Sequence, residues 1–317
     1  MTPQPPSLDE MHFAAKGLEG VVVHSPLVEY RGGAADVWVK AETVQAIGSF
    51  KLRGIFHAAS QLSEEQRAHG LSTVSAGNTA QAVAWVGRHF GVPARSLMPA
   101  TAPITKIEAV KALGGEPVLV PRDEVFRYMR EHAWEQEPYA FIHPWTNRDV
   151  MTGHASLGLE IVADRPDVET VFIPVGGGGL LAGVGSAIKT LRPDVRLVAV
   201  EPEGCPSFHA ALAARGPVDV DCSTICDGVA VPYTTAEMFP LLRDLADDSV
   251  LVSEFDVRAA IKRLATANAL VAEGAGALAL AAATAMSNKE RGVSVCILSG
   301  GSIDAPLLAE IISDPKI

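Results

Sequence analysis

The sequence is short of basic residues, cysteine and long apolar runs, and each shortage excludes a class of protein. Lysine and arginine number 26 against 37 acidic residues, and the net charge of −11 argues against nucleic acid or an anionic membrane as a partner. Four cysteines in 317 residues predict ordinary thiols rather than a disulfide framework. No run is apolar enough to span a bilayer, and the polar, proline-rich start does not resemble a signal peptide. We therefore expect a soluble cytoplasmic protein.

Short β-branched runs alternate with segments of helical period through most of the chain, which predicts βα units and mainly parallel sheets. Four early units can form one compact sheet, with strands at 37–40, 71–75, 96–98 and 117–120. A later stretch, 202–232, is predicted to be irregular because it is rich in glycine, proline and cysteine.

The length of 317 residues suggests about two domains. The pattern of units predicts a small mobile domain, 44–140, inserted into a larger one made of 1–43 and 141–317. A ligand site is expected in the cleft between two such sheets.

One lysine stands where a predicted strand gives way to a predicted helix, in the run Gly48-Ser49-Phe50-Lys51-Leu52-Arg53-Gly54. Its amine would face the positive end of the helix dipole, which disfavours the ammonium form. A lysine poised toward the neutral amine can act as a Schiff-base nucleophile and a general base. The alternatives are a solvated lysine and, for Phe50, a core aromatic rather than a ring-stacking partner.

Two more strand-to-helix junctions are typical of anion sites. The run Ser75-Ala76-Gly77-Asn78-Thr79-Ala80-Gln81 offers backbone N–H groups suited to a carboxylate, although Ser75 and Asn78 could also be helix caps. The run Pro174-Val175-Gly176-Gly177-Gly178-Gly179-Leu180 links a buried strand to a helix through four glycines, which favours phosphate binding. Gly177, Gly179 and Ala182, with Glu201 ending the next strand, also match a dinucleotide fingerprint. A nicotinamide-dependent dehydrogenase is therefore a second candidate.

These stretches together resemble the serine/threonine dehydratase family of pyridoxal-phosphate enzymes, over about residues 22–312. The shared runs occur in the family's order: GSFKLRG, SAGNTAQ, PVGGGGLLAG, DGVAVP, EGAGALALAA and LSGGSID. The resemblance implies an α/β protein with two open, mainly parallel α/β/α sheet domains and the cofactor in the cleft between them. This is the tryptophan synthase β-like architecture, fold type II among pyridoxal-phosphate enzymes.

The resemblance also implies roles at matching positions. Lys51 would hold pyridoxal 5′-phosphate through a Schiff base and would remove the substrate Cα proton. The cofactor-binding positions besides Lys51 would be Phe50, Asn78, Gly176, Gly177, Gly178, Gly179, Gly228, Glu273 and Ser299. The positions that contact the substrate would be Ser75, Ala76, Gly77, Asn78, Thr79 and His154. A neutral serine at 299 facing the pyridine nitrogen would favour β-elimination over transamination.

Four positions depart from the family pattern. One is Thr79, where the family often has a histidine after the asparagine. Ala76 replaces the second serine that racemases of this family use as an acid–base group, so we expect little racemisation. Some members bind a divalent cation through two acids six residues apart, but here Glu201 is followed by Ser207, so we expect no metal. His154 replaces a common glutamine near the substrate side chain, as a substrate contact or as a satisfied polar group.

The implied activity is a pyridoxal-phosphate-dependent ammonia-lyase that converts a β-hydroxy L-amino acid to a 2-oxo acid and ammonia. Threonine, serine, 3-phenylserine and 3-hydroxyaspartate are the substrates to consider, and we expect a homodimer. Besides the dehydrogenase, the alternatives are a β-replacement enzyme or other lyase of the same fold, and a binding protein that has kept the pocket without the chemistry.

Overall fold

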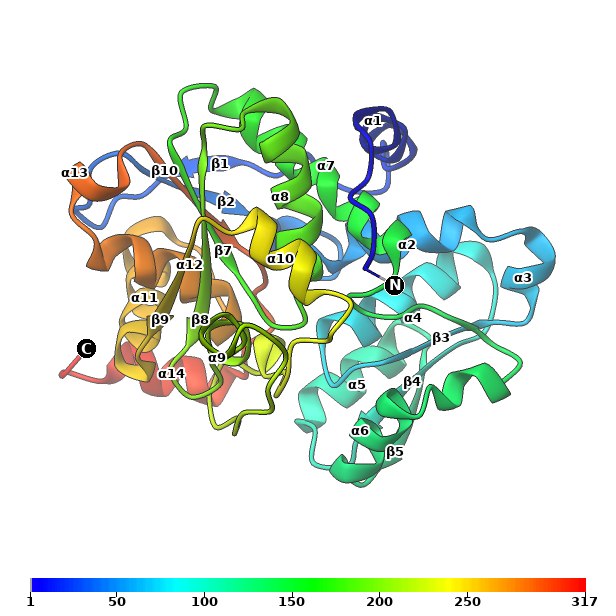
Figure 1. The fold of residues 1–317 in the computed structure, drawn as a ribbon. Coiled ribbons are helices and arrows are strands. Elements are labelled where there is room, and N and C mark those ends of the chain that lie inside the picture. The colour runs from blue at the N-terminus through cyan, green and yellow to red at the C-terminus, as the bar shows by residue number, and fades with distance from the viewer. Residues whose placement is uncertain (1) are drawn as a thin grey trace.

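The computed structural model describes residues 2–317, and its strands form two sheets (Figure 1). The larger sheet has the order β1-β2-β10-β7-β8-β9, and every pair in it is parallel except β1 with β2. Its strands are β1 (Leu27–Glu29), β2 (Val37–Ala41), β7 (Thr170–Pro174), β8 (Arg196–Pro202), β9 (Asp248–Val252) and β10 (Ser294–Leu298). The two mainly parallel sheets confirm the predicted α/β class.

The smaller sheet is parallel throughout, in the order β5-β4-β3-β6. Its strands are β3 (Leu71–Val74), β4 (Ala94–Pro99), β5 (Glu116–Val120) and β6 (Ala140–Phe141). The predicted set of four strands was wrong in one member. β2 pairs with β10 in the larger sheet, and β6 pairs with β3 in its place. The apolar pattern of a strand indicates that the strand is buried but not which strand it pairs with. The sequence therefore did not show which sheet β2 would join.

Helices cover both faces of the larger sheet, and successive residues of its strands enter opposite cores. Phe172 of β7 lies in the core with α11 and α12, whereas Val171 and Ile173 lie in the core with α7 and α8. This period of two explains why the strand is buried at every position. The helices are α1 (Leu8–Gly17), α2 (Lys51–Gln61), α3 (Glu64–Ala68), α4 (Asn78–Phe90), α5 (Ile104–Ala112), α6 (Arg122–Arg130), α7 (Arg148–Asp164), α8 (Gly179–Leu191), α9 (Ser207–Ala214), α10 (Phe239–Leu245), α11 (Glu254–Asn268), α12 (Gly274–Ala285), α13 (Asn288–Arg291) and α14 (Ala305–Ser313).

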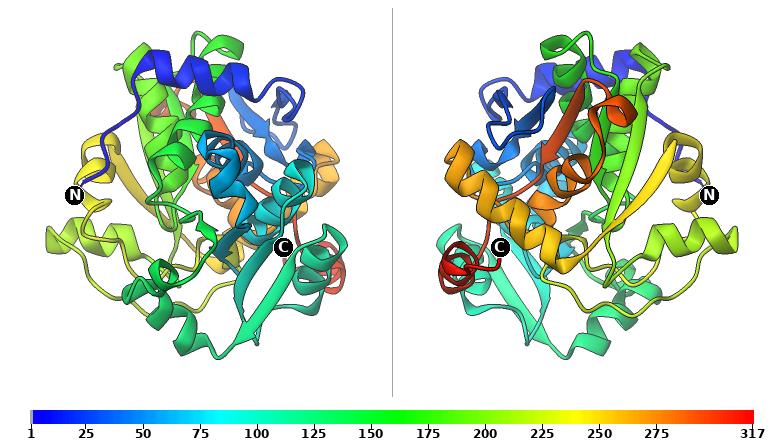
Figure 2. Two further views of the ribbon diagram at one scale, coloured as in Figure 1. Left: turned by 90° about the vertical axis from the view of Figure 1, so that its right-hand side faces the viewer. Right: turned by 90° about the vertical axis from the view of Figure 1, so that its left-hand side faces the viewer.

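The four-stranded sheet and its helices form one end of the molecule, drawn in cyan to green in the two side views (Figure 2). Helix α2 joins the two parts, since it packs against both α7 and α4. Within residues 2–317, no helix is long and apolar enough to cross a membrane.

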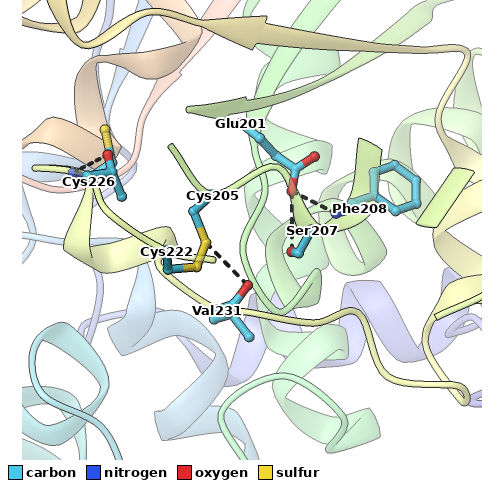
Figure 3. Close-up of a disulfide and its surroundings, with 8 residues drawn as sticks. Glu201, Cys205, Ser207, Phe208, Cys222, Cys226 and Val231 are labelled. Atoms are coloured by element: carbon cyan, nitrogen blue, oxygen red, sulfur yellow. Dashed lines mark hydrogen bonds between the residues drawn. A yellow bond between two sulfur atoms is a disulfide. The ribbon is translucent and has the colours of Figure 1, made fainter. Parts of the chain in front are cut away.

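The stretch predicted to be irregular is more ordered than expected, because it contains α9, a 3₁₀ turn at Asp227–Val229 and a disulfide. Cys205 and Cys222 are bonded, with their Cα atoms 4.4 Å apart (Figure 3). The expectation of four ordinary thiols was therefore wrong for this pair. The chain folds back on itself here, as the bond from Ser223 N to Gly204 O (2.8 Å) shows, and this approach has no local sequence signal.

Candidate active site

A cavity of about 510 Å³ is lined by residues from both sheet units. All of the predicted site residues except His154 line it: Phe50, Lys51, Ser75, Ala76, Gly77, Asn78, Thr79, Gly176, Gly177, Gly178, Gly179, Gly228, Glu273 and Ser299. The structure thus brings together motifs that are far apart in the sequence.

Lys51 begins α2, and the end of β10 fixes the residues before it. Phe50 N donates a hydrogen bond to Ser299 O (3.1 Å), and Gly301 N donates one to Gly48 O (3.0 Å). Ser49 and Gly300 form an antiparallel bridge between these two bonds. The lysine and Ser299 are therefore held at the same wall of the cavity.

The Lys51 amine lies in an apolar setting, with Nζ 4.8 Å from the centroid of the Phe50 ring. Burial lowers the pKa of Lys51 to about 8, and the Glu273 carboxylate opposes this shift. A substantial fraction of the amine is therefore neutral near physiological pH, as a nucleophile or general base requires.

Two residues further along α2, Arg53 anchors the helix to the larger unit. Its guanidinium is fully buried and donates to both carboxylate oxygens of Glu42 (2.7 and 2.8 Å) and of Glu160 (2.7 and 3.0 Å). Lys40 in turn pairs with Glu160 and Asp164, each at 2.8 Å. We call these five side chains the Arg53 cluster. It fixes the start of α2, and with it the position of Lys51.

The tetraglycine loop ends at the N-terminus of α8 and has no room for side chains. A Cβ atom at Gly177 would lie 2.3 Å from Cδ2 of Trp145, and one at Gly176 would lie 2.8 Å from Cα of Val229. Gly178 has φ of +89°, a conformation that other residues rarely adopt. The loop therefore exposes bare backbone at the positive end of a helix, which suits a phosphate.

The turn from Ser75 to Thr79, where β3 leads into α4, forms another part of the cavity wall. Gly77 N donates to Ser75 Oγ (3.1 Å), and Asn78 Nδ2 donates to Glu273 Oε1 (2.7 Å). The next N–H groups of the first turn of α4 have no partner within the helix. The turn therefore presents backbone donors to the cavity and carries no charged side chain of its own.

Glu273, at the start of α12, is buried against this turn. Burial raises the pKa of Glu273 to about 7, while the charge of Lys106 opposes the rise. Within the described residues, Glu273 Oε2 and Asn78 Oδ1 are buried without a hydrogen-bond partner. Buried polar atoms in this state are rare in folded proteins and mark a place where a ligand can supply the missing partner.

His154 lies outside the cavity lining. It is fully buried on α7, with its ring 4.8 Å from the Phe50 ring. Its imidazole occupies the space that Gly54 leaves open, because a Cβ atom there would lie 2.4 Å from His154 Cε1. Burial, reinforced by the charges of Lys51 and Arg53, holds the pKa of His154 well below its usual range. His154 is thus a buried neutral residue outside the lining, and neither of its ring nitrogens has a hydrogen-bond partner among the described residues. Its role as a substrate contact stays a prediction.

Several lining residues were missed by the sequence reasoning. Lys106 of α5 is ion-paired with Asp227 of the 3₁₀ turn, across the cavity. Asp227 precedes a glycine in a run already noted, whereas Lys106 had no signal, since it is one polar residue on an ordinary helix. An outer wall is formed by Arg122, Val125, Phe126, Met129, Trp145 and Tyr233.

Glu201 has a structural explanation. Its carboxylate accepts hydrogen bonds from Phe208 N (2.8 Å) and His209 N (2.7 Å), so it caps the first turn of α9 (Figure 3 shows the bond to Phe208). It is therefore already engaged and not available for a ribose, as the dinucleotide interpretation would require. Among residues 2–317, no three His, Cys, Asp or Glu side chains gather in a way that could hold a metal ion.

Comparisons with known proteins agree on one family. A sequence model described as "Pyridoxal-phosphate dependent enzyme" matches residues 19–300. The chain is 37% identical to an L-threonine ammonia-lyase of Thermotoga maritima, over 97% of this chain and 78% of that protein. It is 38% identical to an L-threonine ammonia-lyase of Geobacter sulfurreducens, over 87% of this chain and 69% of that protein.

Solved structures show the same architecture. Maize serine racemase superposes with a TM-score of 0.89 at 29% identity, over 97% of both chains. The processed form of threonine deaminase isoform 2 from Solanum lycopersicum gives 0.86 at 34% identity, over 98% of this chain and 89% of that one. These matches confirm the predicted fold type and argue against the dehydrogenase.

The residues of the cavity fit pyridoxal 5′-phosphate. A desolvated lysine lines the cavity, and a glycine loop places a helix N-terminus where a phosphate can bind. The side-chain oxygens Asn78 Oδ1 and Glu273 Oε2 are buried without a hydrogen-bond partner among the described residues. Aldehyde, phosphate and polar ring substituents of the cofactor match these three features in kind.

Proposed function

We propose that this chain deaminates L-threonine and L-serine. The premise is its family: the chain belongs to the pyridoxal-phosphate-dependent enzymes and is an ammonia-lyase. The observation that carries the proposal is the meeting of Lys51, the tetraglycine loop and the Ser75–Thr79 turn in one cavity. The names of the relatives support the choice of substrate.

The bound cofactor supplies an electron sink for the Cα–H bond, and the protein supplies position and proton transfer. In our proposal, Gly176 to Gly179 would hold the phosphate, Phe50 would contact the ring, Asn78 would bind the ring oxygen and Ser299 would contact the ring nitrogen. Gly228 and Glu273 complete the wall beside the ring. Gly228 allows the 3₁₀ turn at Asp227–Val229 to pack closely against α12, since a Cβ atom there would lie 3.0 Å from Cβ of Ala275.

Lys51 is the proton acceptor in this scheme. When its amine is not bonded to the cofactor, Lys51 would lie in the desolvated setting that lowers its pKa to about 8. It can therefore take the Cα proton at neutral pH, and the β-hydroxyl then leaves with a proton as water, after which one water molecule hydrolyses the released enamine. A 2-oxo acid and ammonia are the final products.

The Ser75–Thr79 turn holds the substrate carboxylate through its backbone N–H groups. Ala76, the second residue of this turn, lines the cavity but has no ionisable proton. No acid–base group therefore stands at this position on the face opposite Lys51, and we infer elimination with little racemisation.

The outer wall favours a second candidate, a bulkier β-hydroxy amino acid such as 3-phenylserine. Val125, Phe126 and Met129 of α6 face the cavity together with Trp145. Such a wall can bury a phenyl group, because apolar and aromatic side chains dominate binding sites for apolar ligands. Arg122, at the same wall, would instead favour the second carboxylate of 3-hydroxyaspartate.

A substrate panel tests these proposals. The purified holoenzyme is assayed for ammonia and 2-oxo acid release from L-threonine, L-serine, 3-phenylserine and 3-hydroxyaspartate, and for D-serine formation from L-serine. We expect release from threonine and serine with little D-serine. A kcat/KM for 3-phenylserine or 3-hydroxyaspartate well above that for threonine would replace our first choice, and release from none of them would reject the proposal.

We also propose that residues 44–140 move as a small domain on a large one made of 1–43 and 141–317, and that the protein is a cytoplasmic homodimer. The separate four-stranded sheet supports a moving unit, although the pairing of β6 with β3 attaches residues 140–141 to that sheet. Small-angle scattering with and without substrate tests the movement, and light scattering gives the mass in solution.

A further inference from the structure

Lys106 is a buried cation beside the proposed substrate site. It is the third residue of α5, its side chain is 8% exposed, and it is paired with Asp227. Removing a charge from water is costly unless an opposite charge accompanies it. Lys106 therefore needs an anion at this place in the cavity.

The two partners of this pair differ in exposure. The Asp227 side chain is 43% exposed against 8% for Lys106. If the ion pair breaks, water can hydrate the exposed Asp227 carboxylate at a low cost in free energy, whereas the buried Lys106 ammonium cannot be hydrated in this way. The geometry thus allows a second anion to take the place of Asp227, provided that it reaches the Lys106 ammonium.

The Ser75–Thr79 turn lies within that reach. A methyl group built at Gly77 would be 3.7 Å from Lys106 Nζ and 3.8 Å from its Cδ. Among the described lining residues, the other cations are Lys51, which holds the cofactor in our scheme, and the exposed Arg122 on α6. Lys106 is therefore the cation placed to complement an anion on this turn.

We propose that Lys106 is a substrate-binding residue whose ammonium neutralises the α-carboxylate on the Ser75–Thr79 turn, and that Asp227 is the counterion that this carboxylate displaces. The inference rests on the proposed function only in taking an α-amino acid as the ligand. Backbone donors orient the carboxylate, and Lys106 supplies the charge that the turn lacks. Lys106 thereby couples substrate binding to the contact between α5 and the 3₁₀ turn at Asp227–Val229.

Two ligands that differ only at the carboxylate test this role. L-alanine and L-alaninamide both carry the amine and the Cα–H bond but no β-leaving group, so their binding is read from the absorbance of the bound cofactor without turnover. We expect Lys106→Met to weaken the binding of L-alanine by about 10- to 100-fold, the size of a charge-assisted contact. The binding of L-alaninamide should change by less than about twofold, because it lacks the group that Lys106 recognises.

Two further variants keep the test decisive if Lys106→Met does not hold the cofactor. Lys106→Arg should retain the preference for L-alanine over L-alaninamide. Asp227→Asn should strengthen L-alanine binding by a few-fold, because the competing carboxylate is gone, and should leave L-alaninamide unchanged.

Equal weakening of both ligands in Lys106→Met, or unchanged L-alanine binding in either Lys106→Met or Asp227→Asn, would overturn the inference. The substrate panel is a separate outcome. If the holoenzyme releases no ammonia from threonine but Lys106 still discriminates the carboxylate, the proposed function fails and this inference stands.

Discussion

Two groups of charged side chains flank Lys51, and they are built in opposite ways. In the Arg53 cluster, the guanidinium donates to Glu42, Glu160, Ser156 Oγ and the backbone oxygen of Val23, so that each of its nitrogens has an acceptor. On the cavity side stand Lys106, Asp227 and Glu273, which we call the cavity cluster. There, Glu273 Oε2 has no partner among the described residues.

The difference separates a scaffold from a binding site. In a buried ion cluster whose donors and acceptors are all paired, no atom is free to bind a ligand. A substitution in such a cluster should therefore lower the free energy of unfolding. A cluster with unpaired polar atoms and an exchangeable ion pair can still bind a ligand. A substitution in it should therefore weaken ligand binding more than it lowers the free energy of unfolding. Substitutions in the two clusters and in the cavity test this division.

Lys51→Ala should have the largest effect. Ammonia release should fall by at least about a thousandfold, since both the covalent anchor and the proton acceptor are lost. The visible absorbance of the cofactor that borohydride bleaches should also be absent. Lys111→Ala, which removes an exposed lysine of α5, is the matched control and should behave like the wild type. Turnover that survives in Lys51→Ala would contradict the whole scheme.

Arg53→Met should lower the free energy of unfolding by about 3–5 kcal/mol, because it leaves buried carboxylates without their cation. Glu42→Gln should be similarly costly, and the double variant should lose less than the sum of the two, since both remove the same contact. Urea unfolding of the apoprotein measures all three.

Lys106→Met provides the contrast for Arg53→Met. Its partner Asp227 is 43% exposed and can be hydrated, so the free energy of unfolding should fall by less than about 1 kcal/mol. If Lys106→Met proves as destabilising as Arg53→Met, the two clusters do not differ in kind and the contrast is lost.

The same contrast explains what could be read from the sequence. Lys51 and the tetraglycine loop could be singled out because a strand, a special residue type and a helix follow one another locally, and the family resemblance then implied their roles. Lys106 and the Cys205–Cys222 bond were missed because each depends on two segments meeting in space. The exchange of β2 for β6 in the smaller sheet has the same origin, since pairing is decided by packing and not by the pattern of one strand.

His154 shows the limit of reasoning from a matched position. Its place in the sequence suggested a substrate contact or a satisfied polar group, whereas in the structure Gly54 of α2 leaves room for its ring and Gly183 of α8 leaves room for its Cβ atom. A small residue on a neighbouring helix can thus determine whether a side chain packs between helices or lines the cavity. A single sequence does not show which residues will be neighbours in the fold.

Gly177→Ala should disturb the cavity in a graded way. The added methyl group would lie 2.3 Å from Cδ2 of Trp145, and overpacking of this kind costs about 1–3 kcal/mol. We expect the affinity of the apoprotein for pyridoxal phosphate to fall by about 5- to 100-fold, read by fluorescence titration. Gly17→Ala is the control, because nothing lies within 4 Å of a Cβ atom there. Adding Trp145→Ala should recover part of the loss, and no recovery would place its cause outside this contact.

The pH dependence of stability provides the finest comparison, between two buried acids with the same raised pKa. Burial raises the pKa of Glu273 and of Glu201 to about 7. Each carboxyl therefore keeps its proton in the folded protein at a pH where the unfolded chain, with a pKa near 4.5, has lost it. The free energy of unfolding consequently falls as the pH rises from about 4.5 to about 7.

Glu273→Gln should remove this fall, because the amide oxygen can still accept the bond from Asn78 Nδ2 and no charge develops. The apoprotein should gain up to about 3 kcal/mol at pH 8 relative to the wild type, with little difference at pH 4.5. Glu201→Gln should instead be destabilised, most strongly at pH 4.5, since an amide cannot accept both N–H groups of Phe208 and His209 as the carboxyl group does. This loss should shrink toward pH 8, because the amide develops no charge there. Difference curves from urea unfolding between pH 4.5 and 8 measure both variants. If Glu273→Gln lost stability in the same way, its carboxyl would be as fully matched as that of Glu201, and the cavity cluster would belong with the scaffold.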